Sequence, residues 1–328
     1  MTGTEQRLHG LAHEIKSALE DAAASCSREA AIDGIQEHAR TLLHLAAGYD
    51  RHRLYTVFPA AFETAYAALK RDLHEAHHCL AKFTLLKGGS KLIGSEAYNA
   101  RSLGVRLFIL RNLQRMSAQA AAEPARYYTF ANDRFVKDFA IVIGRLAPIG
   151  SFLVEGGAGI PRSILLKGGA RQCASVLKMW FEVGRLKPFY QSHLNLNDLE
   201  FFNREGSELF YLLVAEEMAR DACIRGYMRS NWFIDPAVAQ MSPHLAHFSQ
   251  TPLEHGAYRF LVRWDFEGKS GALATSRTRR RCFESGEYVP AYYMMVWPRG
   301  KMIPWYEAHR KVLANSSIAV GGDTYALA

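Results

Sequence analysis

The string His74-Glu75-Ala76-His77-His78 matches HExxH, the one named catalytic pattern in the chain. When this pattern lies on a helix, its first and last histidines are one turn apart and can bind one zinc ion together. The glutamate between them then polarises a metal-bound water as a general base. His74, Glu75 and His78 therefore predict a metal-dependent hydrolase, with zinc or iron as the metal.

The surroundings of this string support two interpretations. Glu96 follows His78 by eighteen positions, a spacing that resembles the third metal ligand of gluzincin-type metallopeptidases. That resemblance implies a site made by His74, His78 and Glu96, with Glu75 as the base. A single helix over 60–83 is also predicted, because its apolar residues recur every three or four positions. On that helix His74 and His78 lie about 100° from the apolar seam, where ordinary surface histidines are found.

A second group of residues is basic and aromatic. Residues 259–311 hold eleven Lys and Arg against five Asp and Glu, which is six of the chain's eight net positive charges. Three of the five tryptophans lie in the same segment. Arginine beside exposed aromatic rings can hold phosphates and stack bases, so a non-catalytic module that binds nucleic acid or a protein partner is one hypothesis. Strand packing is the alternative explanation for the aromatic residues.

Four arginines gather at the centre of this segment, in the order Arg277, Arg279, Arg280 and Arg281. On a helix they predict a site for an anionic small molecule, or else a solvated helix face.

The residues that follow resemble the closing helix and strand of GNAT-type acyltransferases. The run 278–290 joins a helix end to a turn, and the strand 291–297 comes next; the preceding strand, helix and strand at 227–234, 236–248 and 257–264 are compatible with that family. The resemblance implies an acyl-CoA or acyl-carrier donor lying across a splayed sheet, a small-molecule acceptor, and donor binding by the four arginines. The family's pyrophosphate loop has no counterpart after 233–236, and Phe283 stands where a general-acid tyrosine is frequent.

Three residues are candidates for catalysis. The first is His193, which belongs to a polar cluster with Asn195, Asn197 and Asp198. The second is Asp235, which ends a predicted strand, and the third is Glu284, which follows Phe283 at a helix end. A polar cluster at a strand end is typical of a cleft, although a capped loop explains it equally well. Asp235 has the alternative role of a helix N-cap.

The order of elements predicts a helical N-terminal region, 1–124, packed on a C-terminal mixed α/β sheet region, 125–328, that is catalytic. The first region is rich in Ala, Leu, Glu and Lys, with a break at 87–90 and a further helix over 95–121. The second region alternates strands with helices. Its strands are predicted at 139–144, 151–154, 163–166, 227–234, 257–264 and 289–297, and its helices at 169–184, 205–222, 236–248, 270–285 and 302–313. Residues 321–328 are expected to fray.

The composition excludes several classes of protein. With 49% hydrophobic and 22% charged residues the chain is neither disordered nor a fibre. No apolar run is long enough for a membrane span, and the N-terminus has no signal-peptide core. The five cysteines are scattered and form no CxxC pair, so a cytoplasmic location is expected.

Overall fold

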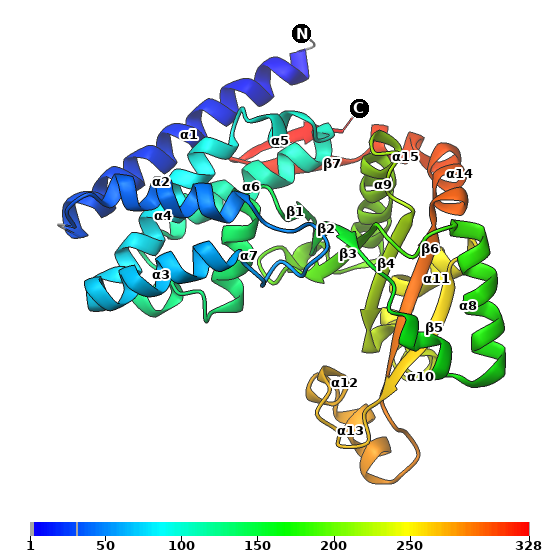
Figure 1. Cartoon of the computed structure of the whole chain (residues 1–328). Helices are drawn as coiled ribbons and strands as arrows, with labels where there is room; N and C mark the ends of the chain where they lie inside the picture. Colours follow the sequence, from blue (N-terminus) through cyan, green and yellow to red (C-terminus); the bar gives the residue numbers. More distant parts are fainter. Residues whose placement is uncertain (1–2, 31, 328) are drawn as a thin grey trace. The chain divides into compact units, whose positions relative to one another are not determined.

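The computed structural model describes residues 3–30 and 32–327, and the chain forms two compact units. One unit holds the residues up to Ile149 together with those from Val312 onward, and the other holds Gly150–Lys311. The predicted fold class is confirmed: a helical N-terminal half precedes a mixed six-stranded sheet with interleaved helices (Figure 1). None of the described helices is long and apolar enough to cross a membrane.

In the described residues, the first unit is built from α-helices and a terminal hairpin. The helices are α1 (Gly3–Ala30), α2 (Ile35–Ala47), α3 (Ala60–Leu73), α4 (His77–Leu92), α5 (Glu96–Asn99), α6 (Leu103–Gln119) and α7 (Asp133–Val142). The strand β1 (Ala147–Ile149) ends the helical half, and α15 (Lys311–Ala314) leads to the hairpin of β7 (Ser317–Val320) and β8 (Asp323–Ala326).

The helix α4 is the centre of this unit, because it contacts α1, α2 and α7. The predicted break at 87–90 is wrong, since Gly88 and Gly89 are buried inside α4. A Cβ atom on Gly88 would lie 2.9 Å from Val142 and 3.0 Å from Leu43, and one on Gly89 would lie 3.0 Å from Leu113. These glycines therefore let neighbouring helices approach α4 closely.

The end of the unit also differs from the sequence-based prediction. Residues 139–142 continue α7 and do not form a strand. The structure divides the chain after Ile149, not near Pro124, because α7 contacts α4 and α6. Residues 321–327, which were expected to fray, are ordered: Asp323–Ala326 pairs with Ser317–Val320, and Gly321 N donates to the side chain of Gln114 at 3.0 Å. Residue 328 of that prediction lies outside the described residues.

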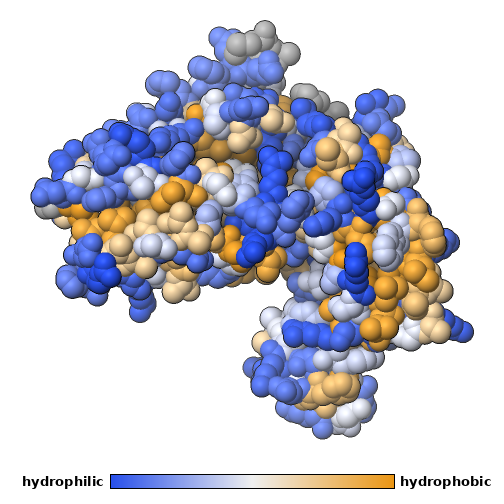
Figure 2. Space-filling model, viewed as in Figure 1, coloured by the Kyte–Doolittle hydropathy of each residue, from blue (hydrophilic) through white to orange (hydrophobic). Residues whose placement is uncertain are grey.

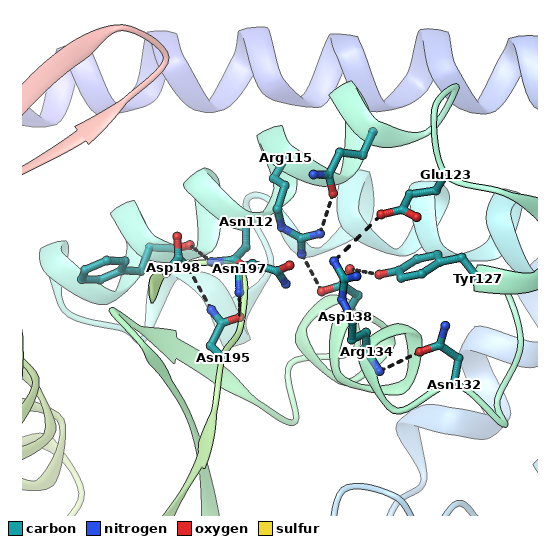
Figure 3. A network of polar contacts seen from close by, with 12 residues as sticks. Asn112, Arg115, Glu123, Tyr127, Asn132, Arg134, Asp138, Asn195, Asn197 and Asp198 are labelled. Atoms are coloured by element: carbon teal, nitrogen blue, oxygen red, sulfur yellow. Dashed lines mark hydrogen bonds and ion pairs between the residues drawn. The ribbon is translucent and has the colours of Figure 1, made fainter. Parts of the chain in front are cut away.

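A buried polar network holds α6 and α7 together (Figure 3). Arg115 Nη2 and Tyr127 Oη each lie 2.5 Å from one of the two carboxylate oxygens of Asp138. Arg115 also donates to Gln119 at 3.1 Å. Burial, together with the charge of Asp138, raises the pKa of Tyr127 and keeps its hydroxyl a donor.

The second unit contains five strands of the sheet. They are β2 (Phe152–Ala158), β3 (Phe189–Leu194), β4 (Gly226–Asn231), β5 (Tyr258–Trp264) and β6 (Ala291–Pro298), and the full sheet has the order β1-β2-β3-β4-β6-β5. Its helices are α8 (Gly169–Val183), α9 (Arg204–Arg220), α10 (Pro236–Met241), α11 (His247–Glu254), α12 (Gly271–Ala274), α13 (Arg277–Glu284) and α14 (Arg299–His309).

The two faces of this sheet have different cores. On one face, Phe189, Met228 and Phe260 pack beneath Val176 and Met179 of α8. On the other, Tyr227 and Trp297 meet the rings of Phe210 and Tyr211 of α9. The predicted helices 169–184 and 205–222 are confirmed as α8 and α9, whereas 163–166 forms a 3-10 helix and not a strand.

Candidate functional site

The sheet of the second unit opens between β3 and β4. This is a parallel pair, and it pairs only at Tyr190 with Tyr227 and at Gln191 with Met228. Beyond that point each strand stays paired on its outer side, β3 with β2 as far as Leu194 and β4 with β6 as far as Asn231. In the described structure, 192–194 and 229–231 therefore carry no ladder pairing to each other. The carboxyl ends of parallel strands are where open α/β sheets bind ligands.

Side chains from both strands meet at this opening. Ser192 Oγ lies 2.7 Å from the hydroxyl of Tyr227, and Arg229 donates from Nε to Ser192 Oγ at 2.9 Å. Burial raises the pKa of Tyr227, so its hydroxyl stays protonated. The three residues tie β3 to β4 by side chains where the backbone pairing stops.

Arg229 on β4 is a buried cation, with a relative exposure of 2%. Its guanidinium carbon lies 3.8 Å from the ring centroid of Phe152 and 5.1 Å from that of Phe210. The rings of Tyr211, Tyr227, Phe233 and Phe248 are within 6.0 Å. Among the residues that the structure describes, Nη1 and Nη2 have no hydrogen-bond partner. The aromatic faces stabilise the cation, and two donors remain for an anion or a carbonyl oxygen.

His193 lies on β3 at the same opening, where it pairs with a buried carboxylate. Its Nε2 is 2.8 Å from Glu155 Oε1 of β2, and the side chains of His193 and Glu155 are 16% and 4% exposed. A carboxylate that accepts from one ring nitrogen holds the histidine in a single orientation and stabilises the imidazolium that forms when the ring takes a proton. The contact with Glu155 therefore fixes the position of the His193 ring at the end of β3.

The rest of the predicted polar cluster is a loop. Asn195 Nδ2 donates to Asp198 at 2.8 Å, and Asn197 N donates to Asn195 Oδ1 at 3.1 Å. The side chain of Ser151 donates to the carbonyl of Asp198 at 2.8 Å. These contacts shape the connection from β3 to α9 (Figure 3).

A pocket of about 540 Å³ lies at the N-terminus of α9. It is lined by Phe202, Asn203, Arg204, Pro243, His244, Leu245, His247 and Gln250. This lining contains Arg204 and two histidines and, as far as the structure describes it, no carboxylate. The positive end of the α9 dipole adds to this charge, so the pocket suits an anion.

The first turn of α9 is tightly built at this pocket. Asn203 caps the helix by accepting from Gly206 N at 2.8 Å. A Cβ atom on Gly206 would collide with the carbonyl oxygen of Phe201. Glycine at this position therefore lets the loop run close against the helix start.

The pocket and the sheet opening share one aromatic wall. Phe202 of the pocket lies 4.4 Å from Phe248 between ring centroids, and both rings also contact Phe152. Burial lowers the pKa of His247, helped by the charges of Arg204 and Arg229. Within the described chain, the buried His247 Nε2 has no hydrogen-bond partner.

Asp235 has a structural place. Its side chain caps α10 by accepting from Ala237 N at 3.0 Å, and it accepts from Tyr288 Oη and Ala291 N at 3.2 Å each. Burial raises the pKa of this carboxyl. The N-cap alternative for Asp235 is thereby confirmed, and the carboxylate joins three segments of the unit.

The four arginines of α13 do not act as one group. Arg279 is buried and donates to Ala272 O at 2.7 Å, Ser242 Oγ at 2.5 Å and Thr275 Oγ1 at 2.9 Å. Arg277, Arg280 and Arg281 are exposed, as is Glu284 at the end of the helix. Arg279 therefore has a structural role, and the prediction that it binds the acyl donor is corrected.

Other basic side chains of the segment 259–311 also contact groups of the same unit. Arg299 Nη1 donates to the carbonyls of Met218 and Asp221 at the end of α9, and Lys301 lies 3.1 Å from Glu182. The guanidinium of Arg263 lies over the ring of Tyr292. The excess charge of this segment thus does not form one open basic face.

The HExxH string does not lie on one helix. α3 ends at Leu73, His74 has a φ of 47°, and residues 74–76 form a 3-10 turn before α4. His78 Nδ1 donates to the carbonyl of Tyr128 at 3.0 Å, and Glu75 Oε2 lies 3.7 Å from His78 Nε2. No group of three or more His, Cys, Asp or Glu that could hold a metal ion exists among the described residues. The predicted single helix over 60–83 is wrong, and His74, His78 and Glu96 are not brought together.

Comparison with known proteins adds no relative: no family model, no curated protein and no solved structure matches this chain.

Proposed function

We propose that the chain is an acyltransferase, similar to the GNAT type, whose donor lies in the opening between β3 and β4. The observation that carries this proposal is the parallel pair that separates after Gln191 and Met228 while both outer pairings continue. The backbone of 192–194 and 229–231 has no ladder partner on the other strand of this pair, and in the proposed complex it pairs with the amide groups of a pantetheine chain. In that family the acyl-CoA lies across a splayed sheet.

The pocket at α9 is the proposed site of the donor's phosphates. Part of its lining, Phe202–Arg204, belongs to the segment that connects β3 to α9. Arg204, His244 and His247 line the pocket beside the N-terminus of α9. The pyrophosphate loop of that family has no counterpart after 233–236, whereas the loop before α9 follows β3, one strand earlier in the chain. The proposal therefore moves donor binding from the arginines of α13 to the start of α9.

The reaction is transfer of an acyl group from a thioester to an amine or hydroxyl of a small molecule. His193, held by Glu155, accepts the proton of the attacking nitrogen or oxygen. The new amide or ester bond forms at the carbonyl carbon, the carbon–sulfur bond breaks, and the thiolate leaves and takes up a proton.

Ligand binding to the full chain tests this proposal. Coenzyme A, acetyl-CoA and phosphopantetheine are added separately, and the midpoint of thermal unfolding is measured. Coenzyme A at about a hundredfold excess over its Kd is expected to raise the midpoint by roughly 5 °C or more. Stabilisation by phosphopantetheine alone would indicate a carrier-linked donor. No stabilisation by any thioester or thiol of this set would remove the proposal.

The charge of the pocket gives a pH-dependent prediction. Because the pKa of His247 is lowered in the empty pocket, the ring is neutral near pH 7, and a bound phosphate favours its protonation. Binding therefore takes up a proton, so the affinity for coenzyme A is expected to rise as the pH falls from 7.5 toward 5.5. Calorimetric titration across this range measures it.

The control for this prediction is His247→Gln, which keeps a hydrogen-bond donor but does not titrate. This variant is expected to bind with a flatter pH profile. An unchanged profile would show that His247 is not the group that takes up the proton.

A further inference from the structure

The helix α8 has a second apolar face besides the one that it buries. Val176, Met179 and Val183 pack on the sheet, whereas Leu177 and Phe181, one turn apart, project into solvent, with Phe181 87% exposed. At about 100° per residue, the exposed Ala170 and Ala174 fall on the same outward stripe. Figure 2 shows the resulting apolar area over α8, at the right-hand edge of the view.

Basic side chains border this stripe. Arg171 and Lys178 of α8 are seven positions apart, so they form an exposed row along one side of the apolar residues. Arg185 follows the end of the helix at Val183 and is also exposed. Exposed residues at the two ends of the helix add to this charge; they are Arg162, Lys167 and Lys187. Glu182, the one acidic residue in 162–187, is already engaged with Lys301 at 3.1 Å and with the hydroxyl of Tyr258 at 2.7 Å.

We propose that this face of α8 binds the surface of an anionic lipid bilayer. A helix with aromatic and aliphatic residues on one side and a Lys/Arg row beside them lies in the plane of the interface, with its apolar side chains among the acyl chains and its cations at the headgroups. Leu166, which is 88% exposed and precedes α8 by three residues, adds a further apolar anchor.

The charge and shape of this face of α8 favour a lipid bilayer over a second copy of the chain and over a protein partner. A second copy of α8 would bring two rows of arginine and lysine together, which is unfavourable. A protein partner needs a complementary groove or surface, whereas Phe181 and Leu166 protrude from the unit. A fluid headgroup region adapts to protruding side chains. The inference does not depend on acyl transfer.

Vesicle sedimentation of the full chain tests the inference. One set of vesicles contains phosphatidylcholine alone, and the other contains equal parts of phosphatidylcholine and phosphatidylglycerol. The chain is expected to bind the mixed vesicles at least about tenfold more tightly, and the binding is expected to weaken at high salt. Each single charge change, Arg171→Gln or Lys178→Gln, is expected to weaken binding about fivefold. Phe181→Ser is expected to weaken it by roughly tenfold or more.

Matched control variants show whether vesicle binding depends on this face of α8 or on the charge and hydrophobicity of the whole chain. Lys16→Gln removes an exposed charge from α1, and Phe266→Ser removes an exposed ring near the end of β5; neither is expected to change binding. Equal binding to both kinds of vesicle, or none to either, would overturn the inference. Concentration-dependent dimerisation that Phe181→Ser abolishes would also overturn it, because a second copy would then be the occupant.

Discussion

Replacing His193 with alanine is expected to slow acyl transfer by about 100- to 10,000-fold. The imidazole is the one titratable ring at the sheet opening that a buried carboxylate holds, with Glu155 Oε1 2.8 Å from Nε2 in the described structure. Without it, the acceptor must lose its proton to water. The measurement is thiol release from acetyl-CoA with a panel of amine and alcohol acceptors, under saturating donor.

Two further variants make this result specific. Glu155→Gln removes the negative charge that stabilises the imidazolium, and is expected to lower the rate by a smaller factor than His193→Ala. His13→Ala, an exposed position on α1, is expected to leave the rate unchanged. A His193→Ala protein that folds, binds coenzyme A and transfers acyl groups at the full rate would show that His193 is not the base.

Replacing Asp138 with alanine is expected to destabilise the first unit by about 3 to 5 kcal/mol. The carboxylate is buried, and it accepts from both Arg115 and Tyr127 at 2.5 Å. Its removal leaves the Arg115 guanidinium, whose side chain is 16% exposed, without its counter-charge. Urea unfolding followed by circular dichroism measures the loss, with the unfolding of each unit fitted separately.

The control is an exposed ion pair of the same unit. Glu37 and Arg40 lie 2.5 Å apart, with both side chains 64% exposed. Glu37→Ala is expected to cost less than about 1 kcal/mol. If Asp138→Ala costs no more than Glu37→Ala, the buried network does not hold α6 and α7 together.

Local signals in the sequence predicted the elements that depend on local contacts. The alternation of strand-like and helix-like runs in the second region predicted α8 and α9, because elements alternate along the chain in an α/β layer. The regular apolar spacing over 60–83 runs through Leu73, Ala76 and Leu80 without a gap, although His74 takes a positive φ directly after the end of α3. The turn is set by tertiary contacts such as that of His78 with Tyr128 O, which no local pattern contains.

The predicted break at 87–90 and the predicted strand at 139–144 were wrong for a related reason. Gly88 and Gly89 resemble a helix break by propensity, yet close packing against Val142 and Leu113 requires them inside α4. The run 139–144 has the composition of a strand, but it is buried on α7. Short apolar runs do not distinguish a buried strand from a buried helix.

The site was only partly visible in the sequence. His193 was found because it stands among polar residues at a strand end, whereas its partner Glu155 lies in a glycine-rich run that reads as a turn. No range was predicted for the strand before His193, so the parallel pairing of β3 with β4 and the loop before α9 were not predicted. Arg229 gave no signal, because most of its environment comes from rings on β2, α9 and α11 that are distant in sequence.

Hydrogen–deuterium exchange of the full chain, with and without a non-hydrolysable acyl-CoA analogue, tests the location of the donor most directly. The backbone amides of 192–194 and 229–231 lack pairing to each other in the described sheet, and donor binding should cover them. The expected result is slower exchange in these two segments and in the first turn of α9. Protection confined to α13, or no protection in any segment, would contradict a donor site at the opening between β3 and β4.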